Sequence, residues 1–297
     1  YALGTAEGPS GLTSGGSAIN LYLVNGEVVG STAATLDDVD ASNSIFNISV
    51  NAAGEVILTQ TGAIDHGSAD SSGYENDTQA LVAELVTLTG TATVTDGDGD
   101  TASDTATIEI GDKFVFRDAG PQITAAPTGG TVDEAHLALG SADVKDPAEI
   151  SVSGNLNVNF GADGAGNVQF TDGSSDSTVA ALEGLGLASG STGLEYVVTG
   201  DGHTLTAYRG TGRDEVDRIF SIEITDPTGN PGYSFILHDA LDHLDGSGAS
   251  IDDLLLSFQH IRVTDSDGDY VETGFDITVM DDAPDDQQIK SVTVDED

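Results

Sequence analysis

The sequence predicts an all-β protein that contains two tandem copies of one antiparallel domain. Short runs of residues alternate between apolar and polar side chains, which is the period-2 pattern of a strand with one solvated face. Turn-forming residues separate these runs, and glycine alone accounts for 38 of the 297 residues. A set of motifs also occurs twice in the same order, which indicates an internal repeat.

The first predicted hairpin joins residues 19–24 to residues 27–29 through Asn25-Gly26. This dipeptide favours a type I′ turn, whose twist matches that of the flanking strands. A second hairpin is predicted where residues 45–50 alternate and residues 56–58 return after a glycine turn. We therefore expect consecutive antiparallel strands in the first copy.

The second copy shows the same patterns. Residues 155–160 alternate strictly, turn through a glycine-rich segment and return as residues 168–170, so a third hairpin is predicted there. Residues 205–208 and 219–224 also alternate. Helical periodicity is brief and occurs only near residues 78–86 and 249–258, so we expect little helix.

The repeat is clearest in an acidic motif. Val94–Asp100 reads Val-Thr-Asp-Gly-Asp-Gly-Asp, and Val263–Asp269 reads Val-Thr-Asp-Ser-Asp-Gly-Asp. Three more motifs recur in the same order. They are Ile45-Phe46-x-Ile48 with Ile219-Phe220-x-Ile222, Ala63-Ile64-Asp65-His66 with Ala240-Leu241-Asp242-His243, and Val132-Asp133-Glu134 with Val294-Asp295-Glu296.

This register divides the chain into residues 1–122, 123–284 and 285–297. The first copy lacks the opening strands of the second, so we expect a truncated or split domain. The last segment is expected to be the opening strand of a third copy or a tail. The chain begins with Tyr1, and we expect it to be an excised piece of a longer array.

Composition excludes several classes of function. The formal net charge is −43, so the basic footprint of a nucleic-acid-binding protein is missing, as is attraction to anionic lipid. No run of 18 apolar residues is present, and we expect no membrane insertion. Cysteine is absent, which removes disulfides and thiolate metal sites. Nucleophile-elbow and P-loop motifs are missing as well, so we expect no enzyme.

The acidic motifs are candidate calcium sites. In an extended chain, alternate carboxylates lie on one side of the backbone, where they repel unless a cation bridges them. Calcium takes six to eight oxygen ligands and tolerates irregular geometry. The alternative is a solvated hairpin turn. The candidate ligands in these motifs are Asp96, Asp98, Asp100, Asp265, Asp267 and Asp269.

Acids that follow or open each copy are further candidates, namely Asp118, Asp133, Glu134, Asp281, Asp282 and Glu296. We expect one calcium at the junction of the copies, near Asp98, Asp100, Asp118 and Glu134; ordinary turn acids are the alternative. His66 and His243 occupy equivalent positions. A metal role is open for them, although a turn role, with Asp65 or Asp242 orienting the ring, is the favoured interpretation.

Together these motifs resemble a known family. The Val-Thr-Asp-x-Asp-Gly-Asp motif, the Asp-Asp-Ala-Pro segment at 281–284 and the Val-Asp-Glu segments are similar to repeats of giant bacterial RTX adhesins, which are exported by type I secretion. The resemblance implies tandem Ig-like β-sandwiches, stacked end to end outside the cell and stiffened by calcium at their junctions.

The expected function is therefore that of an extender, which projects a distal ligand-binding region from the bacterial surface for adhesion or biofilm formation. A peptide- or glycan-binding module of the same adhesin is the alternative. The expected partners are neighbouring repeats of the same chain, with any host or cell-surface ligand bound through another region. We expect a secreted or surface-located monomer.

Overall fold

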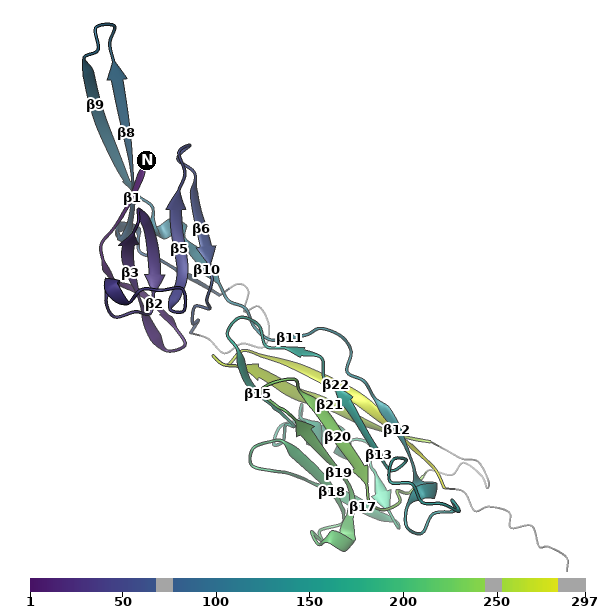
Figure 1. Cartoon of the computed structure of the whole chain (residues 1–297). Coiled ribbons are helices and arrows are strands. Elements are labelled where there is room, and N and C mark those ends of the chain that lie inside the picture. The colour runs from purple at the N-terminus through teal and green to yellow at the C-terminus, as the bar shows by residue number, and fades with distance from the viewer. Residues whose placement is uncertain (68–76, 244–252, 283–297) are drawn as a thin grey trace, which may run out of the picture. The chain divides into compact units, whose positions relative to one another are not determined.

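The computed structural model describes residues 1–67, 77–243 and 253–282 (Figure 1). Within these ranges the protein is almost all β, with several antiparallel sheets, as predicted. It forms two compact units. Unit 1 contains Tyr1–Gln122 together with the segments Phe160–Gly166 and Thr264–Val271, and unit 2 contains the remaining residues.

The larger sheet of unit 1 has the strand order β2-β3-β4-β5-β6, with each neighbouring pair antiparallel. Its strands are β2 (Gly8–Ser14), β3 (Ser17–Val24), β4 (Glu27–Ser31), β5 (Ser44–Val50) and β6 (Val56–Gln60). Both predicted hairpins of this copy are confirmed. At the tip of the first, Asn25 and Gly26 have φ values of 52° and 88°, as a type I′ turn requires.

A second sheet of unit 1 has the order β1-β8-β9, and a two-stranded pair joins β7 to β10. These strands are β1 (Ala2–Thr5), β7 (Thr78–Ala80), β8 (Val86–Thr95), β9 (Thr101–Glu109) and β10 (Val115–Arg117). Figure 1 shows β8 and β9 as a ribbon whose tip extends beyond the rest of unit 1. Inward residues of the two sheets and of β10 form one core, which includes Ile19, Phe46, Ile48, Val86 and Phe116.

The larger sheet of unit 2 has the order β13-β20-β19-β18-β17-β16. Its strands are β13 (Ser151–Asn155), β16 (Ala188–Ser189), β17 (Thr192–Val198), β18 (Thr204–Arg209), β19 (Arg218–Thr225) and β20 (Gly232–Leu237). A four-stranded sheet has the order β12-β22-β21-β15, in which β12 runs parallel to β22. It contains β12 (Gly130–Asp133), β15 (Ala165–Gln169), β21 (Leu254–Asp265) and β22 (Tyr270–Met280).

Aromatic rings fill the core of unit 2. Phe220 and Phe235 of the larger sheet pack against Phe258 of the smaller one, with ring centroids 6.0 and 6.2 Å from Phe258. Tyr233 stacks on Phe275 at 3.9 Å. Unit 2 is thus two sheets packed face to face, which is the sandwich class that the alternation predicts.

The element order supports the internal repeat. The series β3, β4, β5, β6, β8, β9 of unit 1 corresponds to β17, β18, β19, β20, β21, β22 of unit 2. A 3₁₀ turn lies between the second and third strands in both cases, at Leu36–Asp38 and Glu215–Asp217. Among the described residues, unit 1 has no counterpart of β13. In unit 1, β10 ends just before Asp118 and pairs with β7. It does not pair with a strand that corresponds to β12 of unit 2.

Two local predictions were wrong. The alternating segment 155–160 does not form a hairpin with 168–170. Instead, Asn157 has a φ of 56° and separates β13 from β14 (Val158–Asn159), which pairs with β11 (Gln122–Ile123), whereas β15 belongs to the sheet of β21.

The predicted helical segments also differ from the structure. Residues 78–80 form β7, Ala83–Leu85 form one 3₁₀ turn, and Leu254–Phe258 lie in β21; residues 249–252 lie outside the described residues. The one α-helix described, α1 (Thr178–Glu183), begins where the Ser177 side chain accepts the Ala180 N–H. Among the described ranges, no helix combines the length and apolar character needed to cross a membrane.

Candidate metal centre

Unit 1 brings together acids from three segments that are distant in sequence. Asp118 follows β10, Asp163 lies in the segment before β15, and Asp267 lies in the turn between β21 and β22. One carboxylate oxygen from each lies within 4.8 Å of the other two. Asp267 also belongs to a second such group with Asp265 and Asp269. We call these five acids and His66 the Asp118 centre.

Close backbone approach lets these segments meet. A Cβ atom added at Gly166 would lie 1.9 Å from the Asp265 carbonyl oxygen, and one added at Gly161 would lie 2.8 Å from that of Ala119. The Ser266 backbone N–H donates to the Gly164 carbonyl over 3.1 Å, and its hydroxyl donates to the Asp163 carbonyl. Glycine is therefore needed where the segment containing Asp163 lies against its two neighbours.

The centre is buried, and several of its carboxylate oxygens have no hydrogen-bond donor. The side chains of Asp118 and His66 are 1% and 2% exposed, and Asp265 is 3% exposed. Oxygen atoms without a hydrogen-bond partner in the structure include Oδ2 of Asp118, Asp163 and Asp265 and both oxygens of Asp267. Buried carboxylate oxygens are costly unless a donor or a cation compensates them, and unpartnered ones are rare in folded proteins.

The pKa values reflect this environment. Burial, followed by the hydrogen bond and charge of Asp267, raises the pKa of Asp265 to about 8. Burial and the charge of Asp267 also raise the pKa of Asp163 to about 6, and burial raises that of Asp118. All three shifts have the same direction because burial disfavours the charged form of each carboxyl.

His66 lies at the edge of this centre. Its Nδ1 is 3.4 Å from Asp118 Oδ1, and its Nε2 is 3.3 Å from the Phe116 carbonyl oxygen. The expectation that Asp65 orients the ring is corrected, because the Asp65 carboxylate accepts the N–H groups of Gly15 and Gly16. These bonds fix the turn before β3, and the imidazole next along the chain faces Asp118.

Unit 2 contains an equivalent group. The Asp242 carboxylate accepts the N–H groups of Gly190 and Ser191, as Asp65 does in unit 1. The following His243 lies 3.3 Å from Glu134 Oε1, and these two residues form a possible ligand group with Asp281. Glu134 is buried, which raises its pKa, and its Oε1 accepts the Leu241 N–H over 2.8 Å.

The predicted acids thus belong to three separate groups. Asp98 and Asp100 lie with Asp96 in the exposed β8–β9 turn, Asp118 lies in the Asp118 centre, and Glu134 lies with His243. The expected single site at Asp98, Asp100, Asp118 and Glu134 is therefore corrected. In the exposed turn, Asp96 Oδ1 accepts the N–H groups of Asp98, Gly99 and Asp100. This carboxylate oxygen therefore already has hydrogen-bond donors from the backbone of its own turn.

The remaining candidates have local roles or lie outside the described residues. Asp133 caps the 3₁₀ turn Glu134–His136 by accepting the Ala135 N–H, and Asp282 accepts the Ser141 N–H and hydroxyl. Glu296 lies outside the described residues. Sequence reasoning missed Asp163, since a single Asp between glycines has the appearance of an ordinary turn.

The donor set of the Asp118 centre fits a hard cation. Carboxylate oxygens select calcium, magnesium or manganese over zinc or copper, and calcium accepts the irregular arrangements that loops provide. The unpartnered oxygens of Asp118, Asp163, Asp265 and Asp267 are the atoms that would hold it. Bound calcium would supply the positive charge that lets these buried groups ionise together.

Comparison with known proteins adds one finding. Residues 1–110 match the model of a family described as a domain of unknown function, DUF5801. The match ends just after β9, so it covers most of unit 1 but not Asp118. Searches of curated proteins and of solved structures find no match.

The raised pKa values predict how stability depends on pH without a cation. A carboxyl whose pKa is higher in the folded state keeps its proton longer there, so folding loses stability as pH rises from the unfolded value to the folded one. The pKa of Asp265 is about 8 in the folded chain, against an ordinary value of 3.8. The free energy of unfolding should therefore decrease as the pH is raised from about 4 to about 8. Denaturant titrations in the presence of a chelator, carried out at several pH values, measure this free energy of unfolding.

Asp265→Asn provides the control for that titration, because it removes the group with the highest of these pKa values. The variant should show a flatter pH dependence than the unaltered chain. A free energy of unfolding that stays constant or rises from pH 5 to pH 8 without a cation would contradict the prediction.

Proposed function

We propose that this chain is a calcium-stiffened extender segment of a bacterial cell-surface adhesin, which holds a distal ligand-binding region away from the cell. The observation that carries the proposal is the Asp118 centre, where buried carboxylates from three distant segments converge with unpartnered oxygens. The repeated β-sandwich pattern and the resemblance of the acidic motifs to RTX adhesin repeats support it.

The mechanical role follows from the connections of the three acids. Asp118 directly follows β10, Asp163 lies just before β15, and Asp267 lies in the turn between β21 and β22. An ion bound to all three restrains these segments together, since any separation breaks oxygen–calcium contacts. Without the ion, the like charges repel. The chain is therefore stiffer with calcium than without it.

The Asp118 centre would also make the stiffness of the chain depend on the calcium concentration around it. Calcium sites in extracellular modules commonly bind in the range of about 10⁻⁴ to 10⁻³ M. A chain exported into calcium-rich medium would therefore acquire its stiffness only after secretion. The absence of cysteine fits this proposal, because the ion takes the stabilising role that disulfides have in many secreted proteins.

Small-angle scattering of the whole chain tests the proposal. Calcium should narrow the distribution of interatomic distances, and chelation should broaden it. Asp267→Asn, which changes the acid shared by both ligand groups, should remain broad in calcium. Asp98→Asn, in the exposed β8–β9 turn, is the matched control and should behave like the unaltered chain.

Two results would contradict the extender role. One is a distance distribution that calcium does not change; the other is an Asp267→Asn variant that calcium narrows as fully as the unaltered chain. Specific binding of a glycan or peptide by the described units would instead favour the ligand-binding alternative.

A further inference from the structure

The carboxylates of the Asp118 centre fall into two ligand groups. The first group consists of Asp118, Asp163 and Asp267, and the second consists of Asp265, Asp267 and Asp269. Within each group, the three ligand oxygens lie within 4.8 Å of one another. Calcium binds its oxygens at about 2.3–2.6 Å, so two oxygens on one ion are at most about 5 Å apart. Each group therefore has the spacing that one ion needs.

The second group is built by the tight turn between β21 and β22. The Asp265 backbone N–H donates to the Asp269 carbonyl oxygen over 3.0 Å, which closes the turn around Asp267. Gly268 has a φ of 112°, a conformation that favours glycine. Asp265 and Asp269 are 3% and 0% exposed. The backbone of the turn thus holds two buried acids, one on each side of Asp267.

Each group contains a buried carboxylate oxygen that has no hydrogen-bond donor. In the first group this atom is Oδ2 of Asp118, whose side chain is 1% exposed. In the second group it is Oδ2 of Asp265, whose other oxygen, Oδ1, accepts the Gly268 N–H over 3.1 Å. A buried carboxylate oxygen without a donor is costly unless a cation compensates it. The two groups therefore indicate a bound cation independently of each other.

Asp267 connects the two groups. In the described part of the chain it is the one acid that belongs to both. Both of its carboxylate oxygens lack a hydrogen-bond partner, so it has one oxygen available for each group. A carboxylate that binds two cations places negative charge between them, and this charge reduces their mutual repulsion. Asp267 is thus suited to bridge two ions.

The number of buried carboxylates also favours two ions over one. The centre contains five of them, and the His66 imidazole lies 3.4 Å from Asp118. A single divalent ion would neutralise two of the five negative charges, whereas two ions would neutralise four. Because uncompensated charges are costly to bury, the arrangement with two ions is the more favourable one when all five carboxylates are ionised.

We infer that the Asp118 centre binds two calcium ions that share the carboxylate of Asp267. Asp118 and Asp163 complete the site of the first ion, and Asp265 and Asp269 complete that of the second. This inference rests on the proposed calcium-stiffened function and adds a second ion to it. The first ion joins three distant segments, whereas the second stiffens the turn that holds Asp267 in place. Loss of the second ion should therefore also weaken the binding of the first.

Lanthanide luminescence of the whole chain tests whether two ions bind beside each other. Terbium and europium are hard cations that take oxygen ligands as calcium does, and excited terbium transfers energy to europium only when the two ions are close. With both ions present in equal amounts, the terbium emission lifetime should be shorter than with terbium alone. Lanthanum in place of europium accepts no energy and should leave the lifetime unchanged. An ion bound at an isolated site elsewhere in the chain does not contribute to the transfer.

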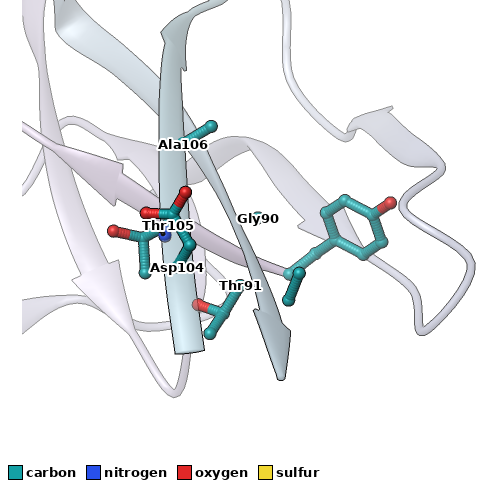
Figure 2. A pocket seen from close by; sticks show the side chains of 7 residues that line it. Gly90, Thr91, Asp104, Thr105 and Ala106 are labelled. Carbon is teal, nitrogen blue, oxygen red and sulfur yellow. Dashed lines mark hydrogen bonds between the residues drawn. The ribbon is translucent and has the colours of Figure 1, made fainter. Parts of the chain in front are cut away.

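Variants that disable one group at a time provide the matched comparison. Asp163→Ala removes an acid of the first group, and Asp269→Ala removes an acid of the second. Each variant should bind one calcium ion fewer than the unaltered chain in native mass spectrometry, and each should lose the effect of europium. Asp104→Ala is the control. Figure 2 shows Asp104 on the β8–β9 ribbon, where its Oδ1 accepts the Thr105 N–H, and it belongs to neither group. This variant should bind as many ions as the unaltered chain.

Two results would overturn the inference. One is a terbium lifetime in the unaltered chain that europium does not shorten, and the other is an unchanged ion count in both Asp163→Ala and Asp269→Ala. The luminescence result comes from the unaltered chain, so it does not depend on how the variants fold. A single ion in the centre would overturn this inference and leave the proposed extender intact. Two bound ions without any response of the scattering to calcium would do the opposite.

Discussion

Chelating calcium is expected to lower the melting temperature of the chain strongly. A ligand that binds only the folded state stabilises it by RT ln(1 + [L]/Kd), which is about 4 kcal/mol at a thousandfold excess over Kd. The buried, unpartnered oxygens of the Asp118 centre are the atoms through which this free energy would act. Differential scanning calorimetry in calcium and in chelator measures the shift.

Two variants show whether the Asp118 centre carries this effect. Asp267→Asn should lose most of the calcium-dependent shift, because Asp267 belongs to both groups of ligands. Asp96→Asn should keep it, because the exposed turn that contains Asp96 already satisfies its carboxylate. Equal melting temperatures with and without calcium, or an undiminished shift in Asp267→Asn, would show that the site does not bind calcium in this way.

Replacing Phe116 by alanine is expected to destabilise unit 1 by about 3–5 kcal/mol, the usual cost of truncating a buried Phe. Its side chain is 1% exposed, and its ring lies 4.9 Å from that of Phe46. Its carbonyl oxygen contacts His66, and Asp118 follows two residues later. The variant should therefore also weaken calcium binding. Urea denaturation and calcium titration measure the two effects.

Val115→Ala is the matched control for that substitution. Val115 precedes Phe116 in β10 but is 48% exposed, so its truncation should cost well under 1 kcal/mol. If Phe116→Ala unfolds at the same urea concentration as Val115→Ala, the buried Phe116 side chain does not stabilise the core of unit 1 beside Asp118.

The all-β class and the first two hairpins were predictable because they depend on local chemistry. Alternation marks a strand with one buried face, and Asn25-Gly26 supplies two positive φ values. The segment 155–160 shows the limit of such reasoning. Its strict alternation gave no sign that Asn157 would adopt a left-handed conformation and direct the two halves to different sheets. Such a change depends on which strands are available as partners.

The candidate metal centre was predictable in its residue types but not in its grouping. The motif at Asp265–Asp269 and the acid at Asp118 were identified from sequence, and the structure places them together. Asp163 was missed because its contribution comes from tertiary contact alone. The two acidic turns look alike in sequence, yet Asp269 is buried and Asp98 is exposed. The difference arises from the surroundings of each turn, which a local motif does not encode.

The spread of the Asp118 centre along the chain has a consequence for the order of folding. Asp118 and Asp267 are separated by about half of the sequence, so their contact closes a long loop and carries an entropic cost that local hairpins avoid. The hairpin with Asn25-Gly26 at its tip does not require the contact between Asp118 and Asp267. The carboxylate oxygens of the Asp118 centre, by contrast, come together only after the β21–β22 turn is in place. An ion that binds such a late contact acts mainly on the rate of unfolding. Calcium would then prolong the lifetime of the folded chain without hastening its formation.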